Sequence, residues 1–196
     1  SLQFGQNVLG ETNSFRLVIE NKGDLSGLPA NVISTASETA KEKDLEGKWV
    51  FTVQKPSMIP FLTYADNRDL REKLFKAYIN LGNNDNEFDN KAIIREMVQL
   101  RAEKSNLLGY ENHAAYILNE NMAKTSDNVY TFLDKVWTPA LEMAKKEASQ
   151  LQSMINSEGH DFDVQPWDWW YYAEKVRKEN YDLEEETMSR YFVLDN

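Results

Sequence analysis

The sequence contains no cysteine and only two histidines among its 196 residues. Without cysteine the chain can form no disulfide framework, no thiolate zinc site and no cysteine nucleophile. Zinc hydrolases commonly hold the metal through two histidines one helical turn apart, with a glutamate beside them as general base. His113 and His160 are not spaced in that way, and no H-E-x-x-H, H-x-x-x-H or E-x-x-H occurs in the sequence. We therefore expect no metal ligands, no catalytic residues and no bound zinc in this chain by itself.

Long apolar runs and an excess of positive charge are also lacking. No apolar stretch approaches the roughly 20 residues that cross a bilayer. The formal net charge of −10 repels phosphate backbones and anionic lipids. Nucleic acid and membrane surfaces are therefore excluded as expected partners. The eight glycines match none of the phosphate-binding or nucleophile-elbow patterns. We expect a cytoplasmic protein, with a periplasmic one as the alternative, because the absence of cysteine does not decide the compartment.

The two histidines and one acidic segment are the remaining candidates for isolated metal sites. His113 precedes an alanine-rich segment, where a capping or surface role is favoured over metal binding. His160 lies between Gly159 and Asp161, which is typical of a solvated turn, although a loop metal site stays open as the alternative. The acids at positions 85, 87, 89 and 96 have the spacing of a calcium loop. Asn90 stands where that loop requires glycine, so calcium binding is not favoured.

The sequence pattern predicts a mainly α-helical protein with one small two-stranded β element. Residues 16–20 and 48–53 alternate as strands do and are rich in β-branched and aromatic types. Helical periodicity predicts the remaining elements, several of them bounded by a capping residue or a glycine. The predicted helices cover residues 29–43 (opened by Pro29), 66–81 (capped by Asp66), 89–109 (capped by Asp89), 126–159 (capped by Ser126 and kinked at Pro139), 166–180 and 182–192 (capped by Asp182).

Five aromatic residues lie within six positions of the predicted helix at 166–180. At 100° per residue they point almost all round a helix, so such a helix must be covered on several sides. The favoured interpretation is an interior helix of a body larger than this chain. The alternative is that Trp and Tyr rings line a peptide channel. The candidate channel-lining or structural residues are Trp167, Asp168, Trp170, Tyr171 and Tyr172.

Both ends of the sequence lead us to expect a piece of a longer protein. It begins at Ser1 without an initiator methionine, and an apolar cluster at residues 191–194 stops two residues before the end. We therefore treat residues 1–196 as one helical section of a larger polypeptide.

Three stretches together resemble one enzyme family. They are GKWVFT at residues 47–52, PFLTYADNR at 60–68 and PWDWWYYAEK at 166–175. In their order and spacing they resemble the thimet oligopeptidase and peptidyl-dipeptidase family of zinc metallopeptidases. Within it the likeness to bacterial peptidyl-dipeptidases is strongest, supported by LRAEK at 100–104 and LLGY at 107–110.

The resemblance implies a fold of many helices around a deep channel, in which zinc held by H-E-x-x-H and a distant glutamate cleaves short peptides. Those ligands would lie downstream of residue 196, in a covalently linked catalytic region. The resemblance thus implies a non-catalytic helical section of an enzyme that removes C-terminal dipeptides from short peptides. The alternative is a free-standing helical scaffold that binds peptides or proteins without chemistry.

Overall fold

A computed structural model describes residues 15–181 of the chain, and the prediction of a mainly helical protein is confirmed. The described residues form seven α-helices and one two-stranded antiparallel sheet. They divide into two compact units, the first built from residues up to Leu81 together with those from Ala148 onward, and the second from Gly82–Glu147. The predicted helix at 182–192, with its acids at 184–186, lies outside the described residues.

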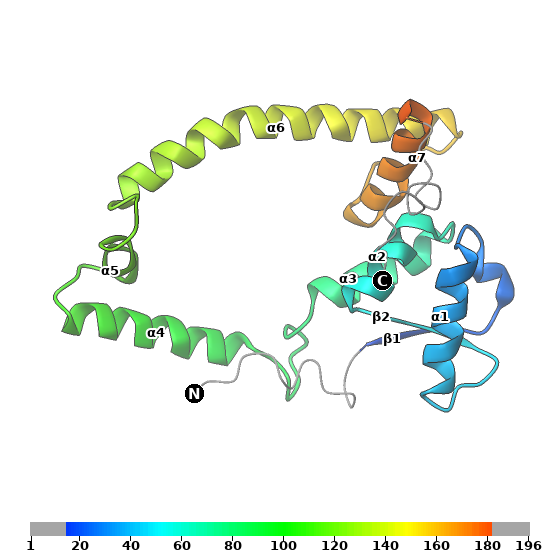
Figure 1. Ribbon diagram of the computed structural model, residues 1–196, viewed down its shortest axis with the longest axis horizontal. Coiled ribbons are helices and arrows are strands. Elements are labelled where there is room, and N and C mark those ends of the chain that lie inside the picture. The colour runs from blue at the N-terminus through cyan, green and yellow to red at the C-terminus, as the bar shows by residue number, and fades with distance from the viewer. Residues whose placement is uncertain (1–14, 182–196) are drawn as a thin grey trace, which may run out of the picture. The chain divides into compact units, whose positions relative to one another are not determined.

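The first unit begins with the predicted sheet. Strands β1 (Arg16–Ile19) and β2 (Trp49–Thr52) pair antiparallel, with Leu17 opposite Phe51 and Val18 opposite Val50. A short 3-10 helix, η1 (Lys22–Leu25), and helix α1 (Ala30–Lys41) connect the strands, and α1 packs against β2 (Figure 1). Pro29 lies one residue before the helix, as its N-cap, instead of opening it.

Helices α2 (Lys55–Tyr64) and α3 (Arg68–Ile79) follow the sheet and contribute Met58, Phe61, Leu62 and Leu74 to the core. Asp66 was predicted to cap α3, but the cap is Asn67, whose side-chain oxygen accepts a hydrogen bond of 3.2 Å from the Leu70 amide. The Asp66 carboxylate instead accepts hydrogen bonds from two distant side chains, described below. The main core lies between the sheet, α1, α2 and α3. Its fully buried members include Leu17, Phe51, Met58, Phe61, Leu62 and Leu74.

The remainder of the first unit comes from the C-terminal part of the described chain. A 3-10 turn, η2 (Pro166–Asp168), leads directly into α7 (Trp169–Tyr181), which confirms the helix predicted at 166–180. Helix α6 (Ser126–Ser157) ends before Gly159, whose φ of +82° is the left-handed conformation that glycine adopts without strain. A small second core joins the end of α6 to α7. It is formed by Leu151, Ile155 and Tyr172.

The second unit holds α4 (Lys91–Leu107), α5 (His113–Leu118) and most of α6. Asp89, predicted as the cap of α4, accepts a hydrogen bond from the Lys91 amide at 2.9 Å, although the residue directly before the helix is Asn90. Ser126 is the first residue of α6, and the hydroxyl of Thr125 accepts a hydrogen bond from the Asn128 amide. Pro139 lies inside α6, which continues as one helix through it (Figure 1). Within residues 15–181 no helix is long and apolar enough to span a bilayer.

Candidate functional site

The densest polar cluster of the first unit is built around Asp168, one of the predicted site residues. Asp168 is the third residue of η2, and its carboxylate accepts the Gln165 amide at 3.1 Å in a capping box. This local bond orients the side chain toward α3. The residue is completely buried. A buried carboxylate is stable only when it is paired and hydrogen-bonded, so its partners define the cluster.

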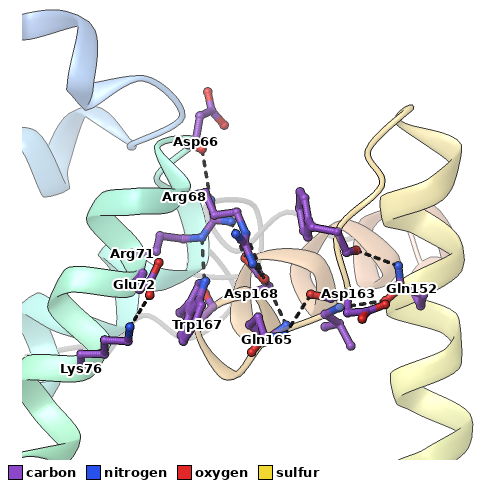
Figure 2. Close-up of polar contacts among 12 residues, drawn as sticks. Asp66, Arg68, Arg71, Glu72, Lys76, Gln152, Asp163, Gln165, Trp167 and Asp168 are labelled. Carbon is purple, nitrogen blue, oxygen red and sulfur yellow. Dashed lines mark hydrogen bonds and ion pairs between the residues drawn. The ribbon is translucent and has the colours of Figure 1, made fainter.

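Two arginines of α3 pair with this single carboxylate. Arg68 donates through Nε and Nη2 to the two Asp168 oxygens at 3.0 and 2.9 Å, and Arg71 donates through Nη2 at 3.0 Å. Figure 2 shows both guanidinium groups projecting from α3 toward Asp168. The spacing of three residues puts both side chains on one face of the helix. The hydrogen bond to Asp168 raises the pKa of Arg68.

Arg71 is almost completely buried, and all of its nitrogens have partners. Its Nη1 donates to the carbonyl oxygens of Ala65 and Asp66 at 2.7 and 3.2 Å, and its Nε donates to the Trp167 carbonyl at 3.4 Å. Ala65 ends α2, so the guanidinium also neutralises the negative end of that helix. One side chain therefore joins α2, α3 and η2.

Tyr171 extends the cluster toward the start of the chain. Its ring lies under the Arg71 guanidinium at 4.0 Å from the ring centroid, a cation–π contact. Its hydroxyl donates to Asp66 at 2.8 Å, and Ser26 donates to the other oxygen of Asp66 at 2.6 Å. Burial alone would raise the pKa of Asp66, but these two hydrogen bonds and the positive charges of Lys175 and Arg71 together outweigh burial and lower it. Burial and the bond to Asp66 raise the pKa of Tyr171.

The loop before η2 is held by a side chain of α6. The Gln152 side chain accepts the Val164 amide at 2.8 Å and donates to the Phe162 carbonyl at 3.0 Å. The Phe162 ring in turn stacks on Arg68, at 4.0 Å from the guanidinium carbon to the ring centroid. This loop therefore places one more ring against the cluster.

The other predicted aromatic residues serve the packing of α7. Tyr172 is buried against Leu151 and Ile155, and Lys175, which pairs with Glu158 at 2.6 Å, lies over its ring. The rings of Trp167 and Trp170 each lie 6.4 Å from that of Phe75, measured between centroids. Trp169 remains more than a third exposed. The structure thus brings Asp168 and Tyr171 into one cluster, with Tyr172 in the adjacent core.

The sequence analysis did not predict the two arginines of this cluster. Arg68 and Arg71 were absent from the expected site, although Arg68 belongs to the stretch that carries the family resemblance. The usable signal was their spacing of three residues on a predicted helix, which is typical of a pair facing one anion.

The cluster can hold α3 and η2 in position, but it offers no group for catalysis. The Asp168 oxygens accept hydrogen bonds from both arginines and from the Gln165 amide, so no lone pair is left to act as a base or a metal ligand. Across residues 15–181 no three His, Asp or Glu side chains gather as metal ligands. His160 stacks on Phe162, and His113 lies beside Tyr116. Two of the acids with calcium-loop spacing, Asp85 and Asp89, pair with Lys91 at 2.5 and 3.1 Å. The described residues do not fit a zinc site.

A groove of about 790 Å³ lies elsewhere in the first unit. It runs between α1, β2, the start of α2 and the end of α3. Its walls combine apolar side chains with hydroxyl, amide and charged groups. Examples of apolar lining residues are Val32 and Phe51, and examples of polar ones are Thr35, Glu42, Lys55 and Tyr78. This mixture and size are typical of a site for a peptide or a small ligand.

Comparison with known proteins finds similarity to one peptidase family over most of the chain. Residues 61–196 match the model of peptidase family M3. The chain is 35% identical over 193 residues to the dipeptidyl carboxypeptidase of Escherichia coli, covering 98% of this chain and 28% of that protein. It is 34% identical over 194 residues to oligopeptidase A of the same organism, covering 97% and 28%. An organellar oligopeptidase A of Arabidopsis thaliana is 32% identical over 202 residues, covering 99% and 25%. The chain thus spans little more than a quarter of the length of these relatives.

Proposed function

Since this chain belongs to peptidase family M3, we propose that it forms a non-catalytic helical section of a zinc-dependent oligopeptidase. One observation carries the proposal: the similarity covers 98% of this chain but only 28% of the dipeptidyl carboxypeptidase, and the 196 residues contain no H-E-x-x-H. The zinc ligands and the general base would then belong to a covalently linked catalytic region. Residues 1–196 act as a single section of that enzyme in this proposal.

The proposed whole enzyme is a peptidyl-dipeptidase that releases C-terminal dipeptides from short peptides. The relatives named dipeptidyl carboxypeptidase support this activity, while those named oligopeptidase A leave internal cleavage as the competing specificity. Zinc supplies the hydrolytic chemistry when it is bound in the catalytic region. We place the enzyme in the cytoplasm, with the periplasm as the alternative compartment.

In this proposal the section forms part of the wall of the peptide channel and holds the wall helices in position. The Asp168 cluster ties α3 to η2 at the start of α7, and η2 and α7 together carry the aromatic residues that the sequence assigned to a channel wall or an interior helix. Trp167, Asp168, Trp170, Tyr171 and Tyr172 keep that role in the proposal. None of them acts on the peptide bond.

A direct experiment compares the 196-residue chain with the polypeptide of its complete reading frame. Zinc content is measured by mass spectrometry, and hydrolysis is followed with internally quenched fluorogenic peptides. We expect stoichiometric zinc and dipeptide release from the longer polypeptide, and neither from the chain alone. Stoichiometric zinc with turnover in the 196-residue chain contradicts the proposal.

The second candidate is a scaffold that binds peptides without cleaving them. The groove between α1, β2, α2 and α3 favours it, because its volume of about 790 Å³ is in the range of ligand sites. A reading frame without H-E-x-x-H, combined with peptide binding that Thr35→Trp abolishes, would support this candidate over the first.

A further inference from the structure

The described residues of the second unit have almost no buried core. Between positions 82 and 147 Ser105 is the one buried residue, and both apolar core clusters of the described chain belong to the first unit. Large apolar side chains of this unit are exposed instead. Leu107 is 87% exposed on α4, and Met122, in the turn between α5 and α6, is fully exposed. Helices in proteins owe most of their stability to packing of an apolar face, so these helices need a covering surface.

Helix α6 carries the clearest uncovered face. Every residue from 130 to 140 is exposed. At 100° per residue, six apolar side chains in this part of α6 fall within a sector of about 140°, with Tyr130 and Leu141 just beyond its edge. We call this sector the α6 stripe; it consists of Phe132, Leu133, Val136, Trp137, Ala140 and Met143.

The α6 stripe has the pattern of a packing surface. Its large members are between 50% and 66% exposed. The charged residues in the same stretch, Asp134, Lys135 and Glu142, fall on the opposite side of the helix. Further along the same helix, Leu151 and Ile155 continue the helical apolar pattern, and there they are buried against Tyr172. Residues of this pattern are therefore covered where the described chain provides a partner, and exposed where it does not.

From these observations we infer that the α6 stripe is an interface for the part of a full-length family M3 polypeptide that these 196 residues do not include. The inference rests on the proposed function. The matched relatives have the length to supply such a partner, because the chain covers only 28% of the dipeptidyl carboxypeptidase. The partner surface must be apolar and uncharged, since the α6 stripe offers neither an ion pair nor a buried polar group.

Two other occupants fit the charge of the chain less well. A second copy carries the same net charge of −10, and this charge opposes self-association. An anionic membrane surface is repelled for the same reason. A linked polypeptide has the further advantage of a high effective concentration, so it covers the face without any intermolecular encounter.

The test uses hydrogen exchange in two polypeptides, the 196-residue chain and its complete reading frame. Amides of residues 129–144 are expected to exchange at least 100-fold more slowly in the complete polypeptide, because covering the apolar face suppresses opening of the helix. Amides of the main core in α2 and α3 serve as internal reference and are expected to change far less. Equal exchange of 129–144 in the two polypeptides overturns the inference.

Matched variants locate the interface on the helix. Leu133→Glu places a charge in the α6 stripe, and Thr131→Glu places the same charge two residues away on the opposite side. In the complete polypeptide Leu133→Glu is expected to accelerate exchange of 129–144 by at least tenfold, and Thr131→Glu to leave it within twofold. Equal effects of the two variants contradict the assignment of this face. If Leu133→Glu does not yield folded protein, acrylamide quenching of Trp137, isolated as the difference between wild type and Trp137→Phe, reports the same burial without a charge.

The outcomes separate this inference from the proposed function. A reading frame without H-E-x-x-H refutes the proposed function, and it also refutes the inferred partner of the α6 stripe. Zinc and activity in the complete polypeptide, with unprotected 129–144, refute the interface alone. Sedimentation velocity of the 196-residue chain from 1 to 100 μM supplies a further check. A dimer that Leu133→Glu dissociates and Thr131→Glu does not would assign the face to a second copy and overturn the inference.

Discussion

Arg71 and Asp168 lie 97 residues apart in the sequence, and their side chains meet as a buried ion pair at 3.0 Å. The two side chains are 1% and 0% exposed. Neither charge can return to water without separating α3 from η2. The pair is therefore a sensitive indicator of whether the two halves of the first unit are assembled.

Replacing Asp168 by Asn tests the ion cluster. The neutral amide leaves two guanidinium groups facing each other without their shared anion, and removing one partner of a buried pair costs about 3–5 kcal/mol. Urea unfolding followed by circular dichroism measures the change. Asp163→Asn, an exposed site in the same loop, is the control and is expected to change stability by less than about 0.5 kcal/mol. Equal midpoints for the two variants would show that the cluster does not support the fold.

Substitution of Gly27 tests the close packing of this residue against Tyr64 and Asp66. Gly27 and Gly47 have nearly the same φ, +83° and +84°, so alanine at either position carries a backbone cost of about 1–2 kcal/mol. A Cβ at Gly27 would lie 2.2 Å from the Tyr64 carbonyl oxygen, whereas a Cβ at Gly47 meets nothing within 4 Å. We expect Gly27→Ala to destabilise the chain by about 1–3 kcal/mol more than Gly47→Ala, as overpacking does. Urea midpoints of the two variants measure the difference, and identical values would contradict the contact.

Tyr171→Phe tests the hydrogen bond to Asp66. Against burial, the bond is one of four contacts that lower the pKa of Asp66 from its usual value of 3.8, so its loss is expected to raise that pKa. Because the pKa is lower in the folded state, the Asp66 contribution to stability is complete above the unfolded value and is lost as pH falls through the folded one. Titration of the carboxyl carbon by NMR measures the pKa directly. Tyr130→Phe is the control and is expected to leave the pKa of Asp66 unchanged. If Tyr171→Phe also left that pKa unchanged, the hydrogen bond would be contradicted.

Neighbouring aromatic residues of α7 are predicted to differ sharply in their effect on stability. Tyr172 is 2% exposed within the small second core, and truncation of a buried aromatic ring to Ala costs about 3–5 kcal/mol. Trp169 is 36% exposed, and Trp169→Ala is expected to cost less than about 1 kcal/mol in the 196-residue chain. Thermal unfolding of both variants measures the contrast. A larger loss for Trp169→Ala than for Tyr172→Ala would show that the core lies on the other side of the helix.

Local sequence patterns predicted both strands and five of the seven described helices, because the causes of these elements are local; α2 and α5 were not predicted individually. Alternating β-branched residues specified the two strands, and glycines at 109 and 159 marked the ends of α4 and α6. Helix starts were less accurate. Asp66 and Asn67 are both good capping residues, and the choice fell to Asn67 because Ser26 and Tyr171 hydrogen-bond to Asp66. A tertiary contact thus decided a detail that propensity left undetermined.

The candidate site could be predicted only in part. The aromatic density at 167–172 identified the region, but the two arginines that pair with Asp168 lie about a hundred residues earlier in the chain. Helical periodicity gives the face of a residue and not its distant partner. The sequence therefore predicts the helical period of α6, but it does not show what packs against residues 130–140, all of which are exposed in the structure.

The first unit is assembled from two separate stretches of chain, with the second unit between them. A ribosome delivers residues in order, so α3 emerges well before η2 has been synthesised. Until Asp168 emerges, Arg68 and Arg71 must stay hydrated, and the surface of α3 that later receives η2 remains open. Completion of this unit therefore waits until η2 has been synthesised, and a nascent chain stalled within α6 would still expose that surface to chaperones and proteases.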